Sequence, residues 1–348
     1  MKIAFVIYDL DKGGAERVVS LLSLELAKEH DVKIIIFGHQ IKYQYGGKII
    51  FLNTPSNKNS FLKGLNIFKR VYKLKKVFKE EKFDEIFSFM ESANFVTSLS
   101  GYNAFLSIRT NPHRFSSLTI YLMKKLYTRS NINKVICVSN EIARSLNEYE
   151  ICHTKVIYNP LDFELIQKLK KEKLHNFKNY IISVGRLHEV KNFDLLIRSF
   201  SKTKAKEQLK LLILGEGSQR KALERLIDTL DLKNKVILVG AVDNVYSYLY
   251  YSKIFILSSK FEGFPNTLIE ALACNVPSIS VDCPTGPKEI INHNENGVLV
   301  ENENEKELTK AIDNLYFDME LQEKLKKTSL ESIKNLNIKD IAQQWLSL

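Results

Sequence analysis

The sequence predicts an α/β protein with two domains built on parallel sheets, and three features support this. Short apolar runs alternate with amphipathic segments along the chain, as in parallel strands joined by helices. The 348 residues exceed what one compact core usually holds. Asn159-Pro160 interrupts the alternation, because proline stops regular structure. We therefore expect a first domain at 1–160 and a second one from residue 161 onward.

In the first half, an apolar strand at 2–8 leads through a Gly13-Gly14 loop into a helix from about Ala15 to Lys28. Glycine lets the backbone approach a ligand, and a helix N-terminus attracts phosphate. An ordinary glycine turn explains the same pattern. Further strands are expected at 32–37, 49–52, 84–89, 104–108, 134–139 and 155–162, with helices at 61–82 and 141–147.

In the second half, five strands are expected with helices between them. Ligands of open α/β sheets bind outside the carboxyl ends of the strands, so the loops that follow the strands are the candidate sites. The expected strands are 180–184, 210–214, 235–239, 253–258 and 276–281.

The stretch EGFPNTLIE carries two glutamates, Glu262 and Glu270, eight positions apart. It follows a buried strand, so Glu262 falls in a loop and Glu270 about one turn into the next helix. A carboxylate at such a place accepts hydrogen bonds from sugar or ribose hydroxyls. The alternative is a plain loop glutamate and a helix-start glutamate favoured by the helix dipole.

Cationic side chains follow the first strand of the second half. Arg186 comes directly after Gly185, and Lys191 lies five residues further on. A guanidinium and an ammonium at a strand end suit a diphosphate. Gly215 and Gly217 follow the next strand and leave room for a nucleotide. A dinucleotide-dependent oxidoreductase is excluded, because the third glycine of its fingerprint is replaced by Arg220.

Five segments together resemble one enzyme family. EGFPNTLIEALAC looks like the E-x7-E signature of the retaining, GT-B-fold glycosyltransferases that use nucleotide sugars (glycosyltransferase family 4-like), including enzymes of bacterial lipid-linked glycan assembly. GGAER, SVGRLHEVKN, LILGEGSQR and DCPTGPKEII match the same family in the same order, so the resemblance spans nearly the whole chain. It implies two Rossmann-like domains facing a cleft. It also implies that the second domain ends at 330 and that a tail helix at 331–348, with Trp345 as a packing anchor, crosses back to the first domain.

The resemblance also implies roles for individual residues. The second domain holds a nucleotide sugar, expected to be a UDP-sugar from the frequency of that donor in the family, and the first domain offers the acceptor. Catalysis is assigned to Arg186, Lys191 and Glu262. Donor binding is assigned to Gly13, Gly14, Gly215, Gly217, Phe264, Pro265, Asn266, Thr267 and Glu270. Contact with acceptor or sugar is assigned to Glu16, Arg109, His113 and Glu289.

One departure from the family pattern concerns a histidine. Related enzymes often carry one at the end of the strand expected here at 104–108, where it contacts donor sugar or acceptor. In this chain Arg109 stands first, and His113 follows four residues later. Arg109 suits a phosphate or carboxylate, and His113 can still reach a hydroxyl. A simple surface loop is the alternative for both.

Neither a metal nor a cofactor is expected. Asp9 and Asp11 mimic the D-x-D metal motif of the other main glycosyltransferase fold, but the nucleotide site is expected elsewhere in the chain, so we interpret them as a polar loop. The four cysteines form no C-x-x-C pair and lie in or beside apolar runs. They are expected to be reduced thiols of a cytoplasmic protein.

The positive charge is concentrated in the first half. Residues 1–160 carry 24 Lys and Arg against 14 Asp and Glu, a net charge of +10, out of +11 for the whole chain. The expected helix at 61–82 is basic, amphipathic and aromatic, which suits an anionic membrane surface. A packed helix with a solvated basic face is the alternative. No apolar run is long enough to span a membrane.

These observations favour a peripheral enzyme on the cytoplasmic face of the cell membrane. Its expected partners are a nucleotide sugar and a polyprenyl-diphosphate-linked glycan acceptor, in surface polysaccharide or glycoprotein glycan synthesis. One alternative is a UDP-sugar epimerase of the same fold, which converts its substrate without an acceptor. A nucleic-acid-binding protein would explain the basic half, but residues 1–160 contain no recognised binding motif.

Overall fold

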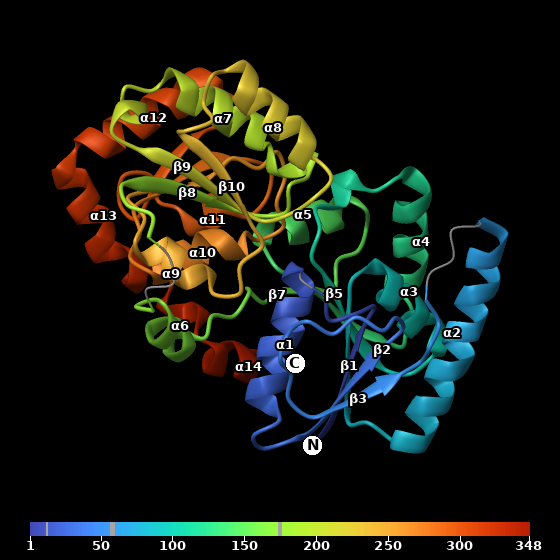
Figure 1. Cartoon of the computed structure of the whole chain (residues 1–348). Coiled ribbons are helices and arrows are strands. Elements are labelled where there is room, and N and C mark those ends of the chain that lie inside the picture. Colours follow the sequence, from blue (N-terminus) through green and yellow to red (C-terminus); the bar gives the residue numbers. More distant parts are fainter. Residues whose placement is uncertain (12, 56–59, 173–175) are drawn as a thin grey trace. The chain divides into compact units, whose positions relative to one another are not determined.

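The computed structural model describes residues 1–11, 13–55, 60–172 and 176–348. Contacts divide the chain into two compact units (Figure 1). The first unit contains Met1–Pro160 together with Ile338–Leu348, and the second contains Leu161–Asn337. The tail was expected to start at residue 331. It joins the first unit only from Ile338, because 331–337 still pack with the second.

The first unit is a parallel sheet of seven strands in the order β3-β2-β1-β4-β5-β6-β7. The order reverses between β1 and β4, and ligands of open α/β sheets bind at such a switch point. The strands are β1 (Lys2–Ile7), β2 (Asp31–Ile36), β3 (Lys48–Phe51), β4 (Glu85–Phe89), β5 (Ala104–Ile108), β6 (Ile132–Cys137) and β7 (Thr154–Val156). The helices are α1 (Gly14–Leu26), α2 (Ser60–Glu81), α3 (Glu91–Ser100), α4 (Ser117–Tyr127) and α5 (Asn140–Glu148).

Both faces of this sheet are covered, because successive residues of a strand point to opposite faces. Phe5 of β1 packs toward α1, and its neighbour Val6 packs toward α2 and α3. The last helix, α14 (Ile338–Leu346), lies beside α1. Its Trp345 is buried with its ring 5.2 Å from Phe87 and 5.3 Å from Phe89. Trp345 is therefore the packing anchor that was expected.

The second unit is a parallel sheet of six strands in the order β10-β9-β8-β11-β12-β13, with a switch point between β8 and β11. Its strands are β8 (Tyr180–Val184), β9 (Lys210–Leu214), β10 (Val236–Gly240), β11 (Phe255–Leu257), β12 (Ser278–Asp282) and β13 (Val298–Glu301). Its helices are α6 (Phe163–Leu169), α7 (Phe193–Lys202), α8 (Arg220–Thr229), α9 (Val245–Tyr250), α10 (Asn266–Ala273), α11 (Pro287–Ile290), α12 (Glu305–Phe317) and α13 (Met319–Ser332).

Each strand expected from the sequence is present, but the one expected at 155–162 is shorter, because β7 ends at Val156, before Pro160. The structure adds β13, whose run VLVE is too short to stand out from the polar residues around it. It also adds α3, which begins directly after β4. The α/β class predicted from the alternation of strand and helix is confirmed, because both sheets consist of parallel strands.

Candidate functional site

The switch point of the second sheet brings two loops together. One follows β8 and carries Arg186 and Lys191, and the other follows β11 and carries Glu262. Because β8 and β11 are parallel neighbours, both loops emerge at the same edge of the sheet. The loops of three residues expected to act on the donor thus lie at the edge of the sheet where ligands of this architecture bind.

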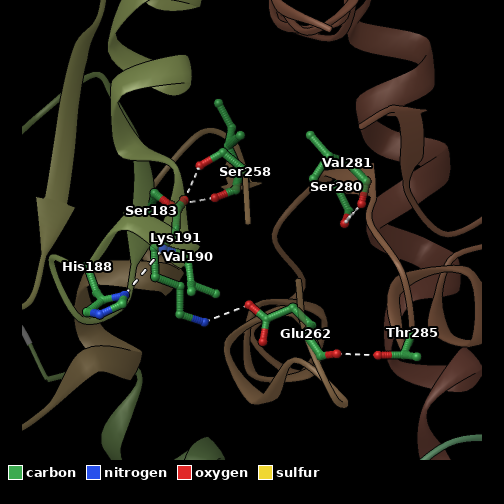
Figure 2. A network of polar contacts seen from close by, with 10 residues as sticks. Ser183, His188, Val190, Lys191, Ser258, Glu262, Ser280, Val281 and Thr285 are labelled. Carbon is green, nitrogen blue, oxygen red and sulfur yellow. Dashed lines mark hydrogen bonds and ion pairs between the residues drawn. The ribbon is translucent and has the colours of Figure 1, made fainter. Parts of the chain in front are cut away.

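Lys191 and Glu262 bind each other directly. Lys191 Nζ lies 2.6 Å from Glu262 Oε1, and the two side chains are 23% and 11% exposed (Figure 2). The backbone around them is held as well, since Ser258 Oγ donates to the Lys191 carbonyl oxygen at 2.9 Å. Ser183 Oγ donates to the Ile256 carbonyl oxygen at 2.6 Å and so ties β8 to β11. The positive charge of Lys191 is therefore presented from a fixed position.

Arg186 is the second cation at this edge, and its side chain is exposed. That side chain makes no ion pair or hydrogen bond with any residue that the structure describes. Gly185, just before it, lies under the Lys191 stem, since a Cβ at Gly185 would be 3.2 Å from Lys191 Cε. An incoming anion therefore finds one cation held by a carboxylate and one exposed to solvent.

The glycines after β9 pack against the loop after β8. A Cβ at Gly215 would lie 1.9 Å from the Gly185 carbonyl oxygen, and one at Gly217 would lie 2.3 Å from that of Leu187. Gly215 also has a φ of +136°, which side chains rarely adopt. The missing side chains thus make room for the Gly185–Leu187 backbone. A role of these glycines in nucleotide binding stays a prediction.

The loop that carries Glu262 continues into α10, which begins at Asn266 after Pro265. No side chain caps the N-terminus of this helix. A helix N-terminus without such a cap presents N–H groups that suit an anion. Glu270 lies one turn into α10, as expected, and is only 4% exposed. Glu289 lies in the short helix α11, whose N-cap Gly286 packs against the loop that carries Glu262. The Glu289 side chain is half-buried.

In the first unit, the structure brings Glu16 and Arg109 together. Gly13 is the N-cap of α1, and the Glu16 carboxylate folds back so closely that a Cβ at Gly13 would lie 2.2 Å from it. Arg109 donates to Ser107 Oγ at 3.2 Å and to Asn159 Oδ1. Burial lowers the pKa of Arg109 to about 9, and the charge of Glu16 opposes this shift.

His113 has a different environment from Arg109. Its Nε2 lies 3.5 Å from Glu148 Oε2, and its Nδ1 lies 3.2 Å from the Tyr149 hydroxyl, both at the end of α5. Its ring remains exposed. The environments of the two side chains thus differ. Arg109 is half-buried near Glu16, whereas His113 lies at the surface.

Glu91 is a residue that the sequence did not single out. It opens α3 directly after β4, at the switch point of the first sheet. Burial raises the pKa of Glu91 from 4.5 to about 7, and its Oε1 has no hydrogen-bond partner among the described residues. Met90 before it has a φ of +73°, unusual for a residue with a side chain. The only signal in the sequence was its place after an expected strand.

Asp9 and Asp11, which mimic a metal motif, have separate partners. Asp9 Oδ1 accepts a hydrogen bond from the Gln40 backbone at 2.9 Å, and Asp11 forms an ion pair with Lys42 at 2.7 Å.

In the described parts of the chain, no helix is long and apolar enough to cross a bilayer.

Two family models match consecutive parts of the chain. The model described as Glycosyltransferase Family 4 matches residues 12–165, and the model described as Glycosyl transferases group 1 matches residues 166–331.

Two curated relatives from one organism match over almost their full length. N-acetylgalactosamine-N,N'-diacetylbacillosaminyl-diphospho-undecaprenol 4-alpha-N-acetylgalactosaminyltransferase of Campylobacter jejuni is 32% identical over 99% of this chain and 98% of its own length. A second protein of that organism, GalNAc-alpha-(1->4)-GalNAc-alpha-(1->3)-diNAcBac-PP-undecaprenol alpha-1,4-N-acetyl-D-galactosaminyltransferase, is 28% identical over 100% of this chain and 98% of its own.

Solved structures share the fold. Anabaena Alr3699/HepE in complex with UDP-glucose superposes with a TM-score of 0.84 at 20% identity, covering 100% of this chain and 98% of that one. The lipopolysaccharide outer core galactosyltransferase WaaB superposes with a TM-score of 0.75 at 20% identity, with the same coverage. The chain therefore belongs to the GT-B-fold glycosyltransferases, with a Family 4 part followed by a group 1 part.

Proposed function

We propose that this enzyme is a retaining glycosyltransferase of lipid-linked glycan assembly. It moves a hexose or N-acetylhexosamine from a UDP-sugar to a hydroxyl of a polyprenyl-diphosphate-linked glycan. The observation that carries the donor half is the ion pair of Lys191 and Glu262 at the switch point of the second sheet, with Arg186 on the same loop as Lys191. The acceptor half is supported by two relatives named for transfer to undecaprenol-diphosphate-linked glycans. UDP as the nucleotide is supported by the HepE complexes.

In this proposal the protein supplies the charge that the reaction needs. The bond from the anomeric carbon of the sugar to the nucleoside diphosphate breaks as the acceptor hydroxyl oxygen bonds to that carbon. Negative charge grows on the departing diphosphate, which takes up the hydroxyl proton. Arg186, Lys191 and the N–H groups of Phe264–Thr267 stabilise that charge. Glu270 accepts hydrogen bonds from the ribose, and Glu262 binds a hydroxyl of the sugar. Since two cations and a helix N-terminus suit a diphosphate by themselves, we propose that no metal is required.

The test is a donor and acceptor screen with the purified enzyme. UDP-sugars are offered with and without a polyprenyl-diphosphate-linked glycan, and release of nucleoside diphosphate is measured in the presence and absence of a chelator. We expect release that depends on the acceptor and survives the chelator, and an α-linkage by NMR if an α-linked donor is used. An isomerised UDP-sugar formed without acceptor would instead establish the epimerase alternative.

The proposal includes peripheral binding at the cytoplasmic face of the membrane through α2. Leu74 and Phe78 of this helix are buried in the first unit's core. Phe68 and Tyr72, one turn apart, are 76% and 72% exposed and lie among basic residues. The helix thus packs on the sheet with one face and presents aromatic rings and lysines on the other. That composition suits the interface of an anionic leaflet.

Not every cation of α2 belongs to this exposed face. Arg70 is 7% exposed and donates two hydrogen bonds to the Thr54 carbonyl oxygen, at 3.0 and 2.7 Å. Its guanidinium lies 5.3 Å from the Tyr8 ring and 5.0 Å from the Phe37 ring. The expectation that the basic residues of 61–82 act together at a membrane is therefore wrong for Arg70, which holds the helix to the sheet.

We expect a change of Lys69, Lys75, Lys76 and Lys79 to Gln to release the enzyme from anionic vesicles. All four are exposed, and each contributes roughly 1 kcal/mol near an anionic surface. Cosedimentation with phosphatidylglycerol vesicles measures the effect, and wild-type binding should weaken as salt rises. The matched control changes four exposed lysines of the second unit, Lys306, Lys310, Lys324 and Lys327, to Gln. Equal loss in both variants would contradict a specific membrane face.

A further inference from the structure

The turn between β12 and α11 packs against the loop that carries Glu262. Thr285 Oγ1 donates a hydrogen bond to the Glu262 backbone carbonyl oxygen (Figure 2). Gly286, the next residue, lies so close that an added Cβ would be 2.7 Å from Pro265 Cδ and 3.0 Å from the Gly263 carbonyl oxygen. Backbone of one loop therefore rests directly on backbone of the other.

Thr285 holds this place in an unfavourable conformation. Its φ is +68°, in the left-handed region, where a β-branched residue is a genuine outlier. Glycine would adopt that backbone without a penalty but has no hydroxyl to donate. Strained residues persist where the surrounding structure dictates them, and they cluster at functional sites. The hydroxyl is what Thr285 provides at this position and glycine would not.

Glu262 is consequently held at both ends. Its carbonyl oxygen accepts from Thr285, and its carboxylate binds Lys191 at 2.6 Å (Figure 2). Thr285 itself is buried. If the Thr285 hydroxyl were removed, the Glu262 carbonyl oxygen would lose this hydrogen-bond donor. That loss favours movement of the loop.

We propose that Thr285 is a positioning residue, whose hydroxyl fixes the loop of Glu262 and thereby keeps the Glu262 carboxylate on Lys191. The consequence for catalysis rests on the function proposed above, in which Glu262 binds the sugar. The fixing of the loop itself is a property of the fold and is measurable without any substrate.

The first experiment compares Thr285→Val, which keeps the shape and removes the hydroxyl, with Thr285→Ser, which keeps the hydroxyl. We expect kcat to fall about 10-fold in the valine variant, the loss typical of a missing buried hydrogen bond, with little change in donor KM. The serine variant should stay within about 2-fold of wild type. Thr203→Val is the matched control, because buried Thr203 also donates to a carbonyl oxygen, that of Phe200.

A double-mutant cycle separates positioning from general damage. If Thr285 acts through Glu262, adding Thr285→Val to a Glu262→Ala enzyme should cause no further loss of kcat, since interacting residues are not additive. Fully additive losses would overturn the proposal. Thr285→Gly also lacks the hydroxyl but accepts the left-handed backbone, so it replaces the valine variant in this cycle if the latter does not fold.

The second experiment needs no activity and uses the thiol of Cys283, two residues before Thr285. Cys283 is buried close to both Lys191 and Glu262, and burial raises its pKa. Because the thiolate is the reactive form, Cys283 should resist alkylation while the loop is held. We expect Thr285→Val to speed alkylation at Cys283 about 10-fold through more frequent local opening. Buried Cys137 and Cys274 serve as internal controls in the same mass-spectrometric experiment.

The two readouts distinguish the ways in which the inference can fail. A wild-type enzyme without transferase activity contradicts the proposed function, while faster alkylation of Cys283 in the variant still supports the fixing of the loop. Unchanged alkylation of Cys283 overturns the inference, even if kcat falls. Faster alkylation with wild-type kcat overturns the link to catalysis.

Discussion

A Lys191→Ala enzyme is expected to turn over its donor about 10²-fold more slowly than the wild type, or worse, and so is Arg186→Ala. Loss of a preorganised group that stabilises transition-state charge has effects of this size. The two variants should differ in stability. Arg186 is exposed, so its removal leaves the fold unchanged. Removal of Lys191 leaves the Glu262 carboxylate, 11% exposed, without its partner, which is destabilising.

Turnover is measured as release of nucleoside diphosphate, and stability as the melting temperature. Lys260→Ala is the matched control, because Lys260 is a lysine of the same unit whose ion pair with Glu303 lies at the surface and has no assigned role. Near-normal turnover in either the Arg186 or the Lys191 variant would remove that residue from the proposed mechanism. An equal loss in the Lys260 variant would show that any lost cation has this effect.

The two glutamates of EGFPNTLIE should separate into different kinetic classes. Glu262→Ala is expected to lower kcat by about 10²-fold, because its carboxylate both holds Lys191 and is proposed to bind the sugar as charge develops. Glu270→Ala is expected mainly to raise the donor KM, because a contact to the ribose is equally strong in the ground and transition states. Each variant is thus the control for the other, since both remove one carboxylate from the same segment.

Steady-state kinetics over a range of donor concentrations, with donor affinity from calorimetry, distinguishes the two outcomes. The reverse result, with Glu270 governing kcat and Glu262 governing affinity, would exchange their roles. Glu270 is almost fully buried, so its variant needs a melting curve beside the wild type before a weaker affinity is attributed to a lost contact. A glutamine at either position, which keeps the size but not the charge, should give an intermediate effect.

Local pattern was enough to predict the parts of the site that lie on one element. Glu270 was expected one turn into a helix, and α10 places it there, because helix and strand leave different periodicities in the sequence. The same holds for Arg186, which directly follows an apolar strand. Such features depend only on residues close in sequence, and they are visible before any folding is known.

Contacts between distant residues were not visible in the same way. Lys191 and Glu262 are 71 positions apart, and their ion pair exists because β8 and β11 are neighbours in the sheet. A helix rich in lysine and arginine suggests that all its cations face solvent. Arg70 is instead buried and bonded to the Thr54 carbonyl oxygen, a contact that the composition of the helix does not show. The left-handed backbone of Thr285 has no signal at all, since threonine is not a residue expected there.

The position of Trp345 sets the order in which the chain becomes stable during synthesis. The strands of the first sheet leave the ribosome before the second unit, yet the aromatic cluster of Phe87 and Phe89 is closed by Trp345, which follows the second unit in the sequence. The second unit, Leu161–Asn337, is continuous in sequence and is fully translated while the first still lacks its final helix. The first unit is therefore completed after the second, and a nascent chain stopped before Ile338 lacks the Trp345 ring that packs on those phenylalanines.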